Sequence, residues 1–316
     1  MSTAALVPET WELDGDDARE TLIATGRWRL SKDAFVRLRY ADGFSHARSM
    51  AFLLSLVLVQ GVIGLVGLAS WFGESGPGEA VLRTIRDVAP GPMGRVITKA
   101  VVHADHAGSA GKWVALTFGL FGAVVTGTTL MAQVERALNR LYGIEQDRPA
   151  LQKYTRGFVM AISVGGLATM SFLAFAFGNA LGSSLWKAVR WPLALMLFAA
   201  AMALLFRKAP HRRQPAWSWL AFGGSISVVL WSLVTFGLGL FVRISSSFGD
   251  AYGPLAGVVA LLLWALLSSV AILYGAAVSA QLEAVRSGQA VPRDPRKAEA
   301  GDDTPVLVGE FAHGLR

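Results

Sequence analysis

Long uncharged runs dominate the pattern of hydrophobic and polar positions in this chain. The longest of them, residues 251–282, contains no Asp, Glu, Lys, Arg or His. A transmembrane helix needs about 20 predominantly apolar residues, and a helix satisfies its own backbone hydrogen bonds in hydrocarbon. We therefore expect this run to cross a membrane as a helix.

Five further runs have the same character and predict an all-α polytopic membrane protein, a bundle of six transmembrane helices. The expected spans are, approximately, residues 50–72, 113–133, 157–180, 191–206, 217–242 and 254–279. The fourth has only 16 residues and is about 24 Å long as a helix. It therefore depends on snorkelling of Lys187, Arg190 and Arg207 at its ends.

Two hydrophilic tails flank the membrane domain, which extends from about residue 27 to residue 285. Residues 1–26 are acidic and are expected to form a mobile tail. Residues 286–316 contain several prolines and scattered charge, which predicts a disordered cytoplasmic tail.

Two segments outside the spans have amphipathic patterns. Basic and apolar residues alternate in 27–40, which predicts a helix lying on the membrane surface, with an ordinary solvated helix as the alternative. The segment 74–112 is divided by Pro90 and Pro92, and each half has helical spacing of its apolar residues. We expect a pair of amphipathic helices there, on the outer surface.

Composition and charge agree with a membrane protein. The 316 residues are 53% hydrophobic and 16% charged, whereas soluble domains have about 25% charged residues. The net charge of +7 is explained by anchoring at a negatively charged inner membrane surface and does not indicate nucleic acid. The absence of cysteine excludes disulfides, zinc–thiolate sites and cysteine nucleophiles.

The distribution of Lys and Arg predicts the orientation. Of the 29 such residues, 21 lie in the segments 1–48, 135–156, 207–213 and 283–316. Positively charged loops stay on the cytoplasmic side. Both termini are therefore expected in the cytoplasm, in a multi-pass protein of the plasma membrane.

The polar groups within the runs are mild. None of the six contains Asp, Glu, His or Lys, the residues that proton- and ion-coupled transporters keep at membrane depth. Gln60 lies in mid-span beside Gly61 and Gly64, where a helix–helix hydrogen bond and a substrate contact are the two interpretations. In the last span, small residues recur every four positions at Ala271, Gly275 and Ser279, a pattern that lets another backbone approach closely.

Candidate contacts for a lipid or partner concentrate after the second span. Arg136 and Arg140 lie four residues apart on one helical face, with Asn139 beside them. They indicate either a headgroup or partner site or an ordinary cluster of cytoplasmic positive charge, and both interpretations apply equally to Arg207, Lys208, Arg212 and Arg213. The full set of candidate substrate or lipid contacts is Gln60, Gln133, Arg136, Asn139, Arg140, Tyr252 and Tyr274.

An ordered set of short motifs resembles one family. Residues 139–143 read NRLYG, 252–256 read YGPLA, and 273–276 read LYGA. With smaller elements near the first span, they make the chain similar to the YihY/BrkB family of bacterial inner-membrane proteins, formerly catalogued as ribonuclease BN. The resemblance covers residues 27–285 and implies a six-helix bundle in the inner membrane with both termini inside.

The last helix departs from the family pattern. Family members commonly read GAELNA at its end, whereas this chain reads GAAVSA at 275–280. Ala277 replaces the usual acid and Ser279 the usual amide. A function that requires that carboxylate would need a neighbouring polar group to replace it.

Three functions compete at this point: binding or moving a lipid or other amphiphile, a non-transporting envelope scaffold, and nuclease activity. Metal-assisted phosphodiester cleavage needs gathered carboxylates or histidines, and the only local grouping is His103, Asp105 and His106 on the outer loop. We therefore expect no catalytic residues, no metal, no cofactor and no enzyme activity. Membrane lipids are the expected partners, nucleic acid is not, and envelope protein partners and self-association stay open.

Overall fold

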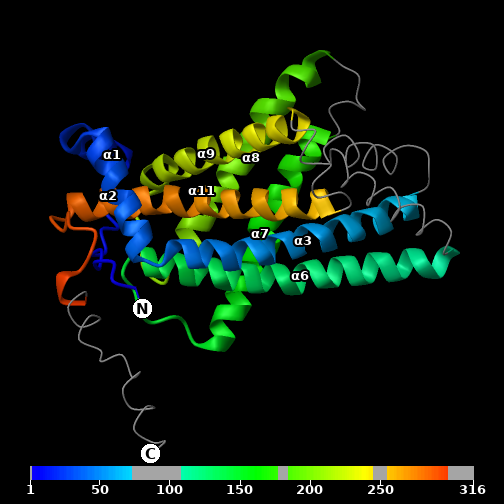
Figure 1. Cartoon of the computed structure of the whole chain (residues 1–316), viewed down its shortest axis with the longest axis horizontal. Helices are drawn as coiled ribbons and strands as arrows, with labels where there is room; N and C mark the ends of the chain where they lie inside the picture. Colours follow the sequence, from blue (N-terminus) through cyan, green and yellow to red (C-terminus); the bar gives the residue numbers. More distant parts are fainter. Residues whose placement is uncertain (1, 73–107, 177–183, 245–254, 298–316) are drawn as a thin grey trace, which may run out of the picture.

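The computed structural model describes residues 2–72, 108–176, 184–244 and 255–297. These residues form a helical bundle (Figure 1), which confirms the all-α fold class. The helices are α1 (Gly15–Thr25), α2 (Arg27–Tyr40), α3 (Gly43–Phe72), α6 (Gly108–Leu141), α7 (Ala150–Ala176), α8 (Ser184–Lys208), α9 (Trp217–Ile244) and α11 (Ala256–Arg286).

Six of these helices, α3, α6, α7, α8, α9 and α11, are long and apolar enough to cross a membrane. The expected number of spans is therefore confirmed. The fourth is longer than its uncharged run, because the spanning segment of α8 covers Ala188–Lys208, or 21 residues. At 1.5 Å per residue this is about 31 Å, but the segment includes the charged residues Arg190, Arg207 and Lys208 near its ends, so the expected snorkelling of basic side chains stays a prediction.

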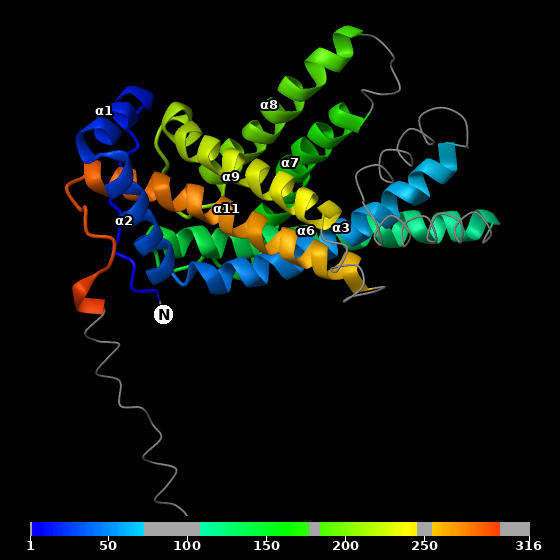
Figure 2. The ribbon, with the colours of Figure 1, turned by 45° about the horizontal axis from the view of Figure 1, so that its top comes forward.

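The helices pack through small residues at two places. α3 and α6 lie side by side (Figures 1 and 2), and a Cβ added at Gly119 of α6 would overlap the backbone of Gly64 in α3. α9 and α11 approach equally closely, because a Cβ at Gly223 would lie 2.5 Å from the Gly275 carbonyl oxygen. The smooth face expected along the last span is thus used for close contact with α9.

Burial is concentrated at one end of the bundle, the end where α1, α2 and the C-terminal turns of α11 lie (Figure 2). Its largest fully buried apolar side chains are Leu38, Leu138, Leu141, Trp219, Leu220, Leu273 and Leu282. Away from this end, large apolar side chains such as Phe118, Phe121 and Phe236 are mostly exposed. Exposed apolar side chains on spanning helices are suited to contact with lipid.

The N-terminal segment differs from the expected mobile tail. The Thr3 amide donates to the Tyr40 carbonyl at 2.9 Å and the Val7 amide to the Tyr142 carbonyl at 3.0 Å. Asp14 then caps α1 by accepting hydrogen bonds from the Asp16 and Asp17 amides. The segment is held by backbone pairing with distant parts of the chain, which its acidic composition does not reveal.

The C-terminal segment is held similarly up to residue 297. The Asp294 amide donates to the Thr3 carbonyl at 2.8 Å, and the Ala5 amide to the Pro292 carbonyl at 3.0 Å. Residues 287–297 therefore pack on the N-terminal segment rather than forming the start of a disordered tail. The remainder of that expected tail, 298–316, lies outside the described residues, as do Tyr252 and the expected outer helices up to residue 107.

The basic helix expected at 27–40 is present as α2, and it is packed rather than simply solvated. It contacts α11 and α3 and buries Leu30, Ala34, Arg37 and Leu38. These positions follow helical spacing on one face. Its location on the membrane surface stays a prediction.

Candidate functional site

Polar side chains are buried at one end of the bundle, which we call the polar end. It is the place where residues 2–13, the α6–α7 connection (142–149), the α8–α9 connection (209–216) and the last turns of α11 meet. The larger buried polar side chains there are Arg37, Glu135, Asn139, Arg148, Lys153, Gln214, Gln281 and Glu283. Groups of this kind are rarely buried without partners, so their bonds explain how these segments are held together.

An ion pair between Arg212 and Glu283 lies at the centre of the polar end. The Arg212 Nη2 and Glu283 Oε1 atoms are 2.5 Å apart, and the two side chains are 2% and 0% exposed. Thr10 donates its hydroxyl to the same Glu283 oxygen, and Arg212 also donates to the carbonyls of Val7 and Pro8. This pair therefore joins α11, the α8–α9 connection and the N-terminal segment.

Arg37 joins the same segments from the side of α2. Its Nε donates to Gln281 Oε1 at 2.7 Å, and its Nη1 donates to the carbonyls of Ala5 and Leu141 at 2.9 and 3.1 Å. Burial lowers the pKa of Arg37 to about 10, although Tyr142 and Glu283 oppose this change. The guanidinium is therefore still charged at neutral pH.

A second buried ion pair joins α6 to the two connections. Arg148 Nη1 lies 2.9 Å from Glu135 Oε2, with side-chain exposures of 5% and 2%. Arg148 also donates to the carbonyls of Ala209 and Pro210 at 3.0 and 2.9 Å. The α6–α7 and α8–α9 connections are thereby fixed against each other.

Two of the predicted contact residues, Arg136 and Asn139, meet at Asp147. Arg136 Nε donates to this carboxylate at 3.0 Å and Asn139 Nδ2 at 3.3 Å, and Lys153 Nζ adds a third bond at 3.1 Å. The Asn139 side-chain oxygen, Oδ1, accepts a hydrogen bond from the His211 backbone amide at 2.8 Å. Both predicted residues thus have partners within the protein, and the Asn139–His211 bond also links α6 to the α8–α9 connection.

Asp147 makes the stability of the polar end dependent on pH. Burial acts to raise the pKa of Asp147, but the hydrogen bonds from Arg136, Lys153 and Asn139 outweigh burial and lower the pKa to about 2. A carboxyl whose pKa is lower in the folded state stabilises above its unfolded value of about 4 and loses this contribution as the pH falls to 2. The contribution at neutral pH is roughly 1 kcal/mol, after allowance for solvent screening.

We therefore expect Asp147→Asn to lower the free energy of unfolding by roughly 1 kcal/mol at pH 6 and by little near pH 2. Unfolding of purified protein in micelles at several pH values, for the wild type and the variant, measures this difference. A difference that stays constant between pH 6 and pH 2 would contradict the assignment of the low pKa to Asp147.

The other predicted contacts do not join one site. Gln133 Nε2 lies 3.0 Å from His46 Nδ1 of α3, and Arg140 donates to the Ile144 carbonyl at 2.6 Å. Tyr274 bonds with Ser31 of α2. Gln60 faces α6 at Gly122, and its Oε1 is buried without a partner among the described residues.

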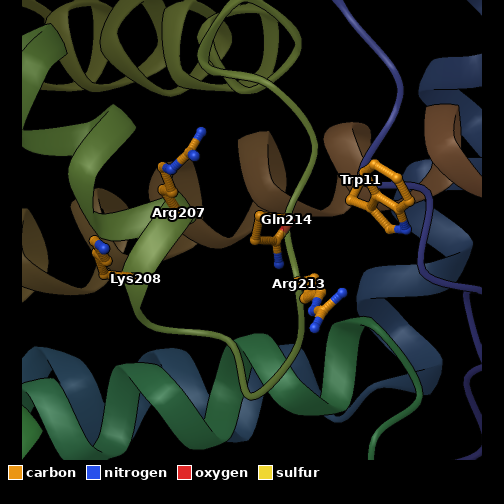
Figure 3. A pocket seen from close by; sticks show the side chains of 5 residues that line it. All are labelled: Trp11, Arg207, Lys208, Arg213 and Gln214. Atoms are coloured by element: carbon orange, nitrogen blue, oxygen red, sulfur yellow. The ribbon is translucent and has the colours of Figure 1, made fainter.

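A pocket of about 360 Å³ opens at the polar end and is lined by Trp11, Arg207, Lys208, Arg213 and Gln214. In the view of Figure 3, Gln214 lies in the middle, with Arg207 and Lys208 on its left and with Arg213 and Trp11 on its right. The lining holds three cationic side chains and no carboxylate. It therefore presents a positive surface with one indole and one amide.

Some of the buried polar residues that were not predicted had a recognisable signal in the sequence pattern. Arg37 falls in the apolar stripe of α2, between Ala34 and Leu38, and a basic residue in such a stripe indicates a buried partner. Glu283 continues the four-residue interval of Gly275 and Ser279, so it lies on the packed face of α11. Trp11 and Gln214 gave no signal, because the fold alone brings these distant positions to one pocket.

Metal-binding geometry is not found in the part of the chain that the structure describes. No group of three or more His, Cys, Asp or Glu side chains able to hold an ion occurs there. The grouping of His103, Asp105 and His106 lies outside the described residues.

Comparison with known proteins places this chain in a family. The family model described as "Virulence factor BrkB" matches residues 34–301. The chain is also similar to "Putative ribonuclease-like protein YfkH" of Bacillus subtilis, with 22% identity over 79% of this chain and 94% of the relative.

Two further relatives are named only as membrane proteins. "UPF0761 membrane protein Smlt0865" of Stenotrophomonas maltophilia is 27% identical over 65% of this chain and 49% of that protein, so the chain matches about half of that relative's length. A UPF0761 membrane protein of Alteromonas mediterranea is 29% identical over 62% of this chain and 69% of the relative. No solved structure matches. Since the family model covers most of the chain and the described residues contain six helices long and apolar enough to cross a membrane, the protein is a multi-pass membrane protein that belongs to the BrkB family.

Proposed function

We propose that the protein binds a lipid or another amphiphile at its polar end and moves it across or within the bilayer. The observation that supports this proposal is the place of the pocket along the spans. The spanning segment of α8 ends at Lys208 and that of α9 begins at Trp217, and four of the five pocket residues lie at positions 207–214. The pocket therefore lies at headgroup level.

The surroundings of the pocket are suited to a molecule with a polar head and an apolar tail. The Arg207 guanidinium lies 4.6 Å from the centre of the Trp217 ring, and such amphipathic side chains are favoured at the membrane interface. Beyond them, α9 exposes apolar side chains such as Val229 and Leu233. A bound amphiphile would keep its tail along such surfaces while its head occupies the pocket.

The test is transbilayer exchange of labelled phospholipids in liposomes that contain the purified protein. We expect exchange above that of protein-free vesicles, and a fall of at least fivefold in Lys208→Gln/Arg213→Gln, since each basic residue near the surface contributes about 1 kcal/mol to the attraction of anionic lipid. Arg39→Gln/Arg156→Gln is the matched control, because these residues are exposed and do not line the pocket. The control should exchange lipid at the wild-type rate.

A folded protein that gives no exchange would overturn the proposal of movement. It would favour the alternative, in which the bundle is an envelope scaffold that only anchors protein partners. We also expect exchange to need no pH gradient, because the uncharged runs offer no carboxylate at mid-membrane depth. No catalytic step is part of the proposal.

A further inference from the structure

We propose that the pocket lined by Trp11, Arg207, Lys208, Arg213 and Gln214 binds the phosphate group of a lipid whose headgroup carries net negative charge. This inference rests on the proposed function and names the substrate class. Its first support is the lining, with cationic side chains from the end of α8 and from the α8–α9 connection. Charge-assisted hydrogen bonds from Arg and Lys are the strongest that a phosphate receives from side chains.

Gln214 gives independent support. The residue is only 9% exposed. Its amide lies at hydrogen-bonding range of the Tyr142 hydroxyl, but this contact lacks the geometry of a full hydrogen bond, so the amide is poorly satisfied among the described residues. Buried polar side-chain atoms nearly always have a partner, and an exception needs an explanation. Both amide atoms are closed off from solvent in this conformation, so the Gln214 amide nitrogen would donate to a phosphate oxygen after its side chain turns into the pocket that the residue lines.

The three cationic side chains of the lining differ in how many contacts they already make within the protein. Arg207 is directed to the Pro215 carbonyl at 3.5 Å and to the Trp217 ring. Lys208 and Arg213 are exposed, and only the backbone amide of Arg213 bonds to the neighbouring Glu9 carboxylate, at 3.2 Å. Lys208 and Arg213 are therefore the exposed cationic side chains of the lining that a phosphate would recruit, and the Glu9 charge opposes its binding.

The same lining argues against a zwitterionic headgroup. A quaternary ammonium is bound where aromatic rings or carboxylates surround it, and here a single indole stands among three cationic side chains. The positive charge of a choline would be repelled by the groups that attract its phosphate. Discrimination between anionic and zwitterionic lipids is therefore the property that defines this site.

The test uses the purified full chain in uncharged micelles, titrated calorimetrically with dihexanoyl phosphatidic acid, dihexanoyl phosphatidylcholine and inorganic phosphate. We expect the phosphatidic acid to bind, and Lys208→Gln/Arg213→Gln to weaken its binding about 30-fold. Gln214→Leu should weaken it about tenfold. Glu9→Gln should strengthen it about fivefold, because this change removes an opposing charge at the edge of the pocket.

Three results would overturn the inference. The first is equal affinity for phosphatidylcholine and phosphatidic acid. The second is equal weakening by Lys208→Gln/Arg213→Gln and by the control Arg39→Gln/Arg156→Gln, which would indicate general surface charge. The third is that inorganic phosphate binds as tightly as the lipid, which would make the site one for the free ion.

Lipid exchange separates this inference from the proposed function. Exchange that persists without preference for anionic headgroups would contradict the inference but not the proposed function. Selective binding of phosphatidic acid without exchange would support the site and refute movement.

Discussion

Glu283→Ala is expected to lower the free energy of unfolding by about 3–5 kcal/mol, because it leaves a buried charge without its partner. The Arg212 side chain is 2% exposed and its Nη2 atom is 2.5 Å from the Glu283 carboxylate. The Thr10 hydroxyl would lose its acceptor as well. Since this pair joins α11, the α8–α9 connection and the N-terminal segment, the variant should also release residues 7–10. Unfolding in micelles and protease sensitivity of the N-terminus measure these two effects.

Arg286→Ala is the matched control on the same helix. Arg286 pairs with Asp17 at 2.8 Å and with Glu20 at 3.1 Å, but its side chain is 36% exposed. Exposed ion pairs contribute about 0–1 kcal/mol, so this variant should be destabilised far less than Glu283→Ala. A loss of stability equal in the two variants would show that the Arg212–Glu283 pair has no special role.

A double variant separates the cost of an unpaired charge from the net contribution of the pair. Replacing both partners of a buried ion pair by apolar residues of similar volume is often neutral or stabilising. Arg212→Met/Glu283→Leu should therefore recover most of the stability lost in Glu283→Ala. A double variant as unstable as the single one would show that the hydrogen bonds of Arg212 to Val7 and Pro8 matter more than its charge.

The six spans were predictable because uncharged runs of this length have few other folds available. The residues at which the spanning helices end, at the polar end of the bundle, were not predictable. α6 continues through Glu135 and Arg140 to Leu141, and α11 continues through Glu283 to Arg286. These charged residues look like the ends of spans in the sequence, but Glu135 and Glu283 are buried in ion pairs with Arg148 and Arg212.

The candidate site was predictable only in part. Arg207, Lys208 and Arg213 stood out as positive charge between two spans, and the pocket uses all three. Arg136 and Asn139 gave an equally strong pattern, but both side chains donate hydrogen bonds to Asp147. The difference depends on which side chains reach each other after folding, and a single sequence does not contain that information.

The acid and amide that the family pattern leads one to expect in α11 are absent at their usual positions, but residues of the same chemistry lie one turn later. Ala277 and Ser279 stand at the usual positions, and one helical turn later along the same faces lie Gln281 and Glu283. Both are fully buried, with Gln281 bonded to Arg37 and Glu283 to Arg212. A carboxylate and an amide are thus still present near the end of the last helix, where they bind basic side chains of the polar end.

The close approach of α9 and α11 gives the second large effect. A Cβ at Gly223 would lie 2.5 Å from the Gly275 carbonyl oxygen and would overlap the Ser279 hydroxyl. Backbone atoms cannot move aside without displacing the helix, so Gly223→Ala should destabilise the protein by about 3 kcal/mol, near the upper end of the usual cost of overpacking. Unfolding in micelles measures this loss.

Gly224→Ala is the control that isolates packing from helix propensity. A Cβ at Gly224 would meet only the Met202 side chain, at 4.0 Å. Alanine favours a helix by about 0.5–1 kcal/mol over glycine, so this variant should be as stable as the wild type or slightly more so. The two variants add the same methyl group at adjacent positions of one helix, and only the one facing α11 should unfold more easily. Equal stability of the two would mean that α9 and α11 do not pack this closely, and the arrangement that carries Glu283 to Arg212 would then have to be revised.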